Sequence, residues 1–146
     1  MTNKQNRVVG ATAGAAICSV ARFVVALAFL YYVSYWGGPW WNGASDMWLA
    51  AFISALIGAP IGALAGSTCQ PLLGAFVGAG LSGVSCLGLF VLPTELAIGM
   101  SHPGGFDRIE TLHVLVGFMA MILAGAAAGG CGAAIGRRGG ISNLGR

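Results

Sequence analysis

The fold is decided by an uncharged stretch at residues 47–94, which reads MWLAAFISALIGAPIGALAGSTCQPLLGAFVGAGLSGVSCLGLFVLPT. A helix that crosses a bilayer needs roughly 20 predominantly apolar residues, so this stretch is long enough for two such helices. It is broken once, at Gly66-Ser67-Thr68-Cys69-Gln70-Pro71. Because glycine favours helix C-termini and proline favours the first helical turn, we predict helices over 47–67 and 71–92.

Two further apolar stretches flank this central one. Residues 8–36 are interrupted only by Arg22, and residues 111–136 contain no charged side chain. Each is long enough to span a bilayer. The chain is therefore predicted to be all-α, a polytopic membrane protein with transmembrane helices at about 8–36, 47–67, 71–92 and 111–136. The alternative for the N-terminal stretch is a cleaved signal peptide, which fits poorly because Arg22 interrupts it where the cleavage region should lie.

The composition excludes an ordinary water-soluble domain. Hydrophobic residues make up 57% of the 146 residues and charged residues only 8%, whereas soluble proteins average about 25% charged residues. The mean hydropathy is +0.83. So few charged side chains cannot cover the surface of a water-soluble protein of this size. We expect one membrane domain, residues 1–146, with the lipid bilayer as its surroundings.

The distribution of basic residues predicts the orientation. The positive-inside rule assigns the side with more Lys and Arg near the helix ends to the cytoplasm. One side carries Lys4, Arg7, Arg137, Arg138 and Arg146. The opposite side carries only Arg108, so both termini are predicted to be cytoplasmic. The short connections favour a bacterial inner membrane, and basic ends beside an anionic leaflet explain the net charge of +3 without nucleic acid.

Glycines recur every four residues in all four predicted helices. These glycines are Gly10, Gly14, Gly58, Gly62, Gly66, Gly74, Gly78, Gly125 and Gly129. Glycine at this spacing lets two helix backbones approach closely in a membrane, so we interpret them as helix-packing residues. All lie in the cytoplasmic half, while larger side chains gather in the outer half. The pattern predicts a bundle that is narrow at its cytoplasmic end, with the wider end either filled by large side chains or open as a cleft.

A weak internal repeat accompanies the glycines. Residues 8–17 (VVGATAGAAI) resemble residues 72–81 (LLGAFVGAGL) at an offset of 64. Residues 58–63 (GAPIGA) resemble residues 125–130 (GAAAGG) at an offset of 67. Two tandem two-helix hairpins would explain both similarities. The alternative is that Gly- and Ala-rich helices resemble one another by composition alone.

Arg22 is the candidate functional charge, because an ionisable residue within a membrane span is costly and often functional. No carboxylate lies within any predicted span. Its available partners are therefore lipid phosphate, backbone carbonyls and serine hydroxyls. We favour a side chain that extends to the headgroups as an anchor. The alternative is a contact with an anion or a substrate.

The connection between the third and fourth predicted helices contains the only cluster that resembles a metal site. Its weak candidate ligands are His102, Glu110 and His113, since imidazole and carboxylate suit zinc or manganese. The favoured interpretation is a solvated loop followed by an acidic first helical turn. No metal and no cofactor is predicted.

Four cysteines occur without the C-x-x-C spacing of redox or zinc sites. They are Cys18, Cys69, Cys86 and Cys131. None lies in a predicted outer connection, so we interpret them as reduced, small packing residues.

The sequence contains no Walker loop, no nucleophile elbow and no zinc-protease helix motif. We therefore expect a non-enzymatic structural or interaction subunit, forming a homo-oligomer or assembling with other membrane subunits through any glycine face left on its outside. The alternative is a small transporter or channel with an outward-facing cleft and Arg22 in its pathway.

Overall fold

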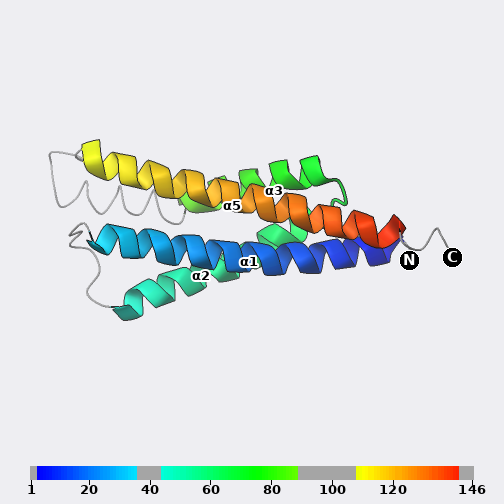
Figure 1. Ribbon diagram of the computed structural model, residues 1–146, viewed down its shortest axis with the longest axis horizontal. Coiled ribbons are helices and arrows are strands. Elements are labelled where there is room, and N and C mark those ends of the chain that lie inside the picture. Colours follow the sequence, from blue (N-terminus) through cyan, green and yellow to red (C-terminus); the bar gives the residue numbers. More distant parts are fainter. Residues whose placement is uncertain (1–2, 36–43, 89–107, 142–146) are drawn as a thin grey trace.

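The computed structural model describes residues 3–35, 44–88 and 108–141, which form four helices (Figure 1). The helices are α1 (Asn3–Tyr35), α2 (Ala44–Gly66), α3 (Pro71–Cys86) and α5 (Arg108–Ile141). The predicted all-helical fold is thereby confirmed. Three of these helices contain apolar segments long enough to cross a membrane, at Lys4–Tyr32, Met47–Gly66 and Leu115–Arg138.

Helix α3 is apolar but shorter than the other three. Its 16 residues correspond to about 24 Å at ~1.5 Å per residue, compared with a hydrocarbon thickness of roughly 30 Å. Residues 89–92 of the predicted helix lie outside the described residues.

The break between α2 and α3 lies where the sequence predicts it. Helix α2 ends at Gly66 and α3 begins at Pro71. The hydroxyl of Ser67 donates a hydrogen bond of 2.8 Å to the Leu64 carbonyl, and that of Thr68 donates one of 2.8 Å to the Ala65 carbonyl. These bonds use carbonyls of the last turn of α2, which have no partner further along the helix.

Helices α1 and α5 are longer than their apolar segments. Helix α1 begins at Asn3 instead of residue 8, and α5 covers Arg108–Ile141 instead of 111–136. Counting apolar residues identifies only the part of a helix that matches the hydrocarbon layer. The helical hydrogen bonding continues beyond this part into the polar and charged residues that flank it.

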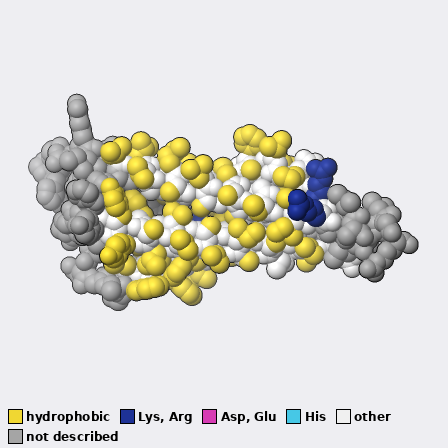
Figure 2. Space-filling model, viewed as in Figure 1, with side chains coloured by type: hydrophobic (Ala, Val, Ile, Leu, Met, Phe, Trp, Pro, Cys, Tyr) yellow, Lys and Arg dark blue, Asp and Glu magenta, His cyan; other side chains and the backbone are white. Residues whose placement is uncertain are grey.

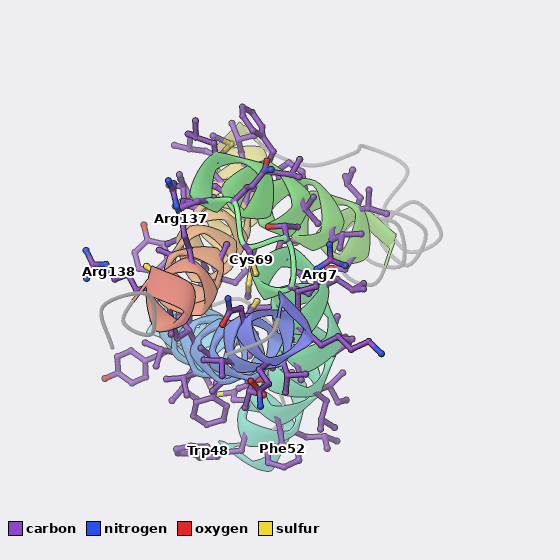
Figure 3. The ribbon with its side chains drawn as sticks, turned by 90° about the vertical axis from the view of Figure 1, so that its right-hand side faces the viewer. Arg7, Trp48, Phe52, Cys69, Arg137 and Arg138 are labelled. Carbon is purple, nitrogen blue, oxygen red and sulfur yellow. The ribbon has the colours of Figure 1, made fainter. Side chains whose placement is uncertain are left out.

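Helices α1 and α5 run side by side in opposite directions along the length of the molecule (Figure 1). Helix α2 packs on α1, and α3 packs on α5. The start of α1 and the last turns of α5 lie at the same end, which Figure 3 views with Arg7, Arg137 and Arg138 labelled. We call this the basic end. Both ends of the described chain therefore meet at one end of the bundle.

The distribution of side-chain size is inverted relative to a water-soluble protein. The largest side chains that are fully buried are Arg22, Cys18, Ser54 and Ser82. Large apolar side chains instead lie outside, as Phe76 does with 75% of its surface exposed. Figure 2 shows hydrophobic side chains along the length of the visible face, and among the described residues it shows a group of basic side chains at one end. Large apolar side chains are thus exposed on every described helix.

The predicted taper of the bundle is visible for one pair of helices, α1 and α2. In Figure 1, α2 approaches α1 near the basic half and diverges from it towards the other end. The gap contains large rings there: Phe23 and Trp48 have ring centroids 5.9 Å apart. Figure 3 shows Trp48 and Phe52 at the periphery of the bundle, beside α2. The predicted outward cleft would adjoin residues 36–43 and 89–107, which lie outside the described residues.

Candidate functional site

The predicted packing glycines are all buried, and they bring helix backbones together within one chain. A methyl group placed on Gly14 would collide with the carbonyl oxygen of Gly62, and one placed on Gly62 would collide with the carbonyl oxygen of Gly14. The helices α1 and α5 meet in the same way, because a methyl group on Gly132 would lie 2.6 Å from the Gly14 Cα atom. These surfaces therefore hold the monomer together and do not form an exposed glycine face.

The glycine contacts in the two halves of the molecule correspond to each other. The reciprocal contacts are Gly10 with Gly66 and Gly14 with Gly62 between α1 and α2, and Gly74 with Gly129 and Gly78 with Gly125 between α3 and α5. Helices α1 and α3 match at the predicted offset of 64, whereas α2 and α5 match at 63 instead of 67. Because the glycines repeat every four residues, a sequence alignment of the two hairpins is ambiguous by one helical turn. The contacts between glycines in the structure determine which alignment is correct.

Arg22 lies in the interior of the bundle with 0% of its surface exposed. Its Nε donates a hydrogen bond of 3.2 Å to the Ser54 carbonyl on α2, and its Nη1 donates one of 3.0 Å to the Ser85 hydroxyl on α3. The interpretation of Arg22 as an anchor that extends to the headgroups is therefore wrong. The physical reason is its register: buried positions in α1 recur every four residues, and Arg22 lies on that line between Cys18 and Ala26.

Several buried donors in the interior of the bundle are unsatisfied. The buried Nη2 of Arg22 and the buried hydroxyls of Ser54 and Ser82 have no hydrogen-bond partner within the part of the chain that the structure describes. The Ser85 hydroxyl is already engaged, since it donates a 3.0 Å bond to the Ser82 carbonyl. None of the side chains described is a carboxylate, so no described side chain neutralises this guanidinium.

Two buried thiols share the buried register of these groups. Cys18 lies one turn before Arg22 on α1, and Cys86 lies one turn after Ser82 on α3. All four cysteines are free thiols. Cys69 lies in the connection between α2 and α3, where its backbone φ is 54°. Figure 3 labels this residue in the view from the basic end.

The structure does not describe the side chains of the predicted metal ligands. His102 lies outside the described residues, and Glu110 and His113 lie in α5 with side chains that are likewise outside them. Within the described residues, no group of three His, Cys, Asp or Glu side chains could hold a metal ion. The weak metal prediction is therefore untested.

A groove of about 300 Å³ lies between α1 and α5. It is lined by Val25, Phe29 and Tyr32 of α1 and by Val116, Gly117 and Ala120 of α5. The lining is apolar and includes exposed residues of both helices, so the groove opens on the side of the bundle. Arg22 is not part of this lining.

The sequence analysis gave serine hydroxyls as available partners of Arg22 but did not say which serines. Ser82 belongs to the four-residue repeat of α3, and Ser54 lies four residues before Gly58 in α2. A search for polar residues that continue the glycine lines would have found both. Ser85 lies off these lines, and only the arrangement of α1 against α3 identifies it.

No protein-family model matches this chain, and neither curated proteins nor solved structures give a match.

Proposed function

We propose that this chain is a small multi-pass integral membrane protein of a bacterial inner membrane, with cytoplasmic termini, that acts as a non-enzymatic structural or interaction component. The observation that carries the proposal is the inverted distribution of side chains. Phe76, Leu72 and Val84 are exposed on α3, whereas Ser82 is fully buried on the same helix. Water would penalise this arrangement, and lipid favours it.

The packing at the basic end supports a component that does not conduct. A channel or transporter needs a continuous path through the bundle. In the basic half, backbone atoms of Gly10 and Gly66 and of Gly14 and Gly62 are in direct contact. The buried polar side chains lie further along the bundle, around Arg22. The polar region is thus closed from the basic end by helix backbones.

Contacts with other subunits would involve large apolar side chains, not the glycines. The reciprocal glycine pairs are already used between helices of one chain. Trp48 and Phe52 are more than half exposed on α2, and Phe76 is exposed on α3. These rings offer the extensive van der Waals contact on which association in lipid depends.

A transporter or channel is the second candidate, because Arg22 carries a buried charge with an unsatisfied Nη2. A buried ionisable residue within a membrane span commonly marks an ion pathway. For this candidate, the glycine contacts of the basic half would have to separate during each transport cycle.

A flux measurement distinguishes the two candidates. The full chain is reconstituted into liposomes loaded with a halide-sensitive dye, and chloride entry is followed under an applied potential. We expect the same rate as in protein-free liposomes. Chloride entry above that rate, and abolished by Arg22→Met, would establish the transporter and overturn the proposed role.

A further inference from the structure

We propose that Arg22, together with the hydroxyls of Ser54 and Ser82, forms an occluded binding site for a small inorganic anion of halide size. The argument begins with the charge. An arginine in a protein is always protonated and presents five N–H donors. For Arg22, the structure assigns partners to Nε and Nη1 and leaves Nη2 without one. An unpaired charge buried away from water is strongly unfavourable, so an anion at this position would stabilise the bundle.

The groups around Arg22 select an anion over a cation. The hydroxyls of Ser54 and Ser82 are both buried and unpaired, and each can donate a hydrogen bond. The backbone carbonyl of each serine is linked to the guanidinium by hydrogen bonds, directly for Ser54 and through the Ser85 hydroxyl for Ser82. The Ser54 carbonyl accepts from Nε, and the Ser82 carbonyl accepts from the Ser85 hydroxyl that binds Nη1. The region therefore combines a fixed positive charge with unused donors, and its described side chains include no carboxylate.

The packing around these groups favours a small ion. Arg22, Ser54 and Ser82 are each 0% exposed. The arginine stem is held against α2, since a methyl group on Gly58 would lie 2.9 Å from the Arg22 Cδ atom. On the other side, Ser82 Oγ faces α5, where a methyl group on Gly125 would collide with it. A lipid phosphate carries bulky substituents that such packing does not admit, whereas a chloride or bromide ion carries none.

Such a site would link helices that pack on different partners. Ser54 belongs to α2 and Ser82 to α3, while Arg22 belongs to α1. An ion bound by all three would add charge-assisted hydrogen bonds between them. Because a ligand that binds only the folded state stabilises it, the stability of the folded bundle would depend on the anion in the buffer.

The test measures this dependence directly. The full chain is placed in nanodiscs of zwitterionic phosphatidylcholine, and sodium gluconate is replaced stepwise by sodium bromide at constant ionic strength. Thermal unfolding is followed by tryptophan fluorescence, for which the chain has four tryptophans. We expect the melting temperature to rise with bromide and then to saturate.

Variants assign the effect to the site. Arg22→Met is expected to abolish the rise in melting temperature. Ser54→Ala and Ser82→Ala retain the charge, and each is expected to raise the half-saturating bromide concentration about tenfold, the equivalent of one hydrogen bond to a charged group. Arg7→Met removes an exposed positive charge at the basic end and serves as the matched control. It should respond to bromide like the parent chain.

Three results would overturn the site. One is a melting temperature that is the same in bromide and gluconate, as expected if only water meets the donors. Another is a rise that persists in Arg22→Met. The third is a bromide-free rise in nanodiscs of anionic phosphatidylglycerol that Arg22→Met removes and Arg7→Met does not, because this would identify a lipid headgroup as the ligand.

Discussion

Replacing Gly62 with valine is expected to separate α1 from α2 and to lower the free energy of unfolding by about 3 kcal/mol or more. The Cα atom of Gly62 faces the carbonyl oxygen of Gly14, and any side-chain carbon would collide with that oxygen. A backbone carbonyl cannot rotate away as the end of a flexible side chain can. The two helices must therefore move apart, and the neighbouring contact of Gly10 with Gly66 would weaken as well.

The matched control is Gly80→Val in α3. Nothing lies within 4 Å of a methyl group placed on Gly80, so the same side chain should fit without displacing a helix. We expect this variant to change the free energy of unfolding by less than ~1 kcal/mol, in the stabilising direction, because valine is a better helix former than glycine. Unfolding of the purified chain in mixed micelles by added sodium dodecyl sulfate measures both variants. Equal destabilisation by the two would contradict the packing described.

The glycine correspondence adds a second comparison to this experiment. Gly125 occupies in the α3–α5 pair the place of Gly62 in the α1–α2 pair. Gly125→Val should therefore destabilise the chain to a similar extent. This result would support two equivalent hairpins whose second helices are related by an offset of 63.

Replacing Arg22 with methionine is expected to stabilise the folded chain, in contrast to Gly62→Val and Gly125→Val. In halide-free buffer, we expect this variant to raise the free energy of unfolding by about 1–4 kcal/mol, the range found when apolar residues replace buried ion pairs. The substitution removes an uncompensated charge. No hydrogen-bond donor of the neighbouring helices loses its partner. The Ser85 hydroxyl still donates to Ser82, and the Ser54 carbonyl lies within helix α2.

Arg22→Lys is the informative companion variant. It keeps the charge but loses the planar set of donors that reaches both Ser54 and Ser85. It should be less stable than the parent chain by the same titration. If Arg22→Met loses as much stability as Arg22→Lys, the prediction is wrong. Arg22 would then stabilise the bundle by holding the helices together.

The helices and their packing residues could be predicted because they depend on local rules. An uncharged stretch broken at Gly66 and Pro71 determines α2 and α3, and the apolar residues on either side determine the membrane-compatible parts of α1 and α5. The spacing of the glycines identifies the close contacts. Spacing alone could not determine which turn of α5 meets which turn of α3, since glycines four residues apart are interchangeable in a sequence comparison.

The partners of Arg22 could not be predicted for a different reason. The direction of a side chain around its helix axis follows from the four-residue register, but the groups that it meets there depend on how the helices pack. Arg22 shares the buried register of Gly14 and Cys18, which places it inside the bundle. Its contact with Ser85 of α3 depends on the tertiary arrangement of the hairpins.

The central claim is that lipid covers the large apolar side chains on the outside of the bundle. Nitroxide labels at positions 20, 56 and 123, in a chain whose cysteines are replaced by alanine, test it directly. Val20, Leu56 and Leu123 are exposed on α1, α2 and α5, respectively. In nanodiscs, we predict more frequent collisions of all three labels with dissolved oxygen than with a water-soluble nickel chelate, and the reverse at position 7. More frequent collisions with the nickel chelate at positions 20, 56 and 123 would contradict the account.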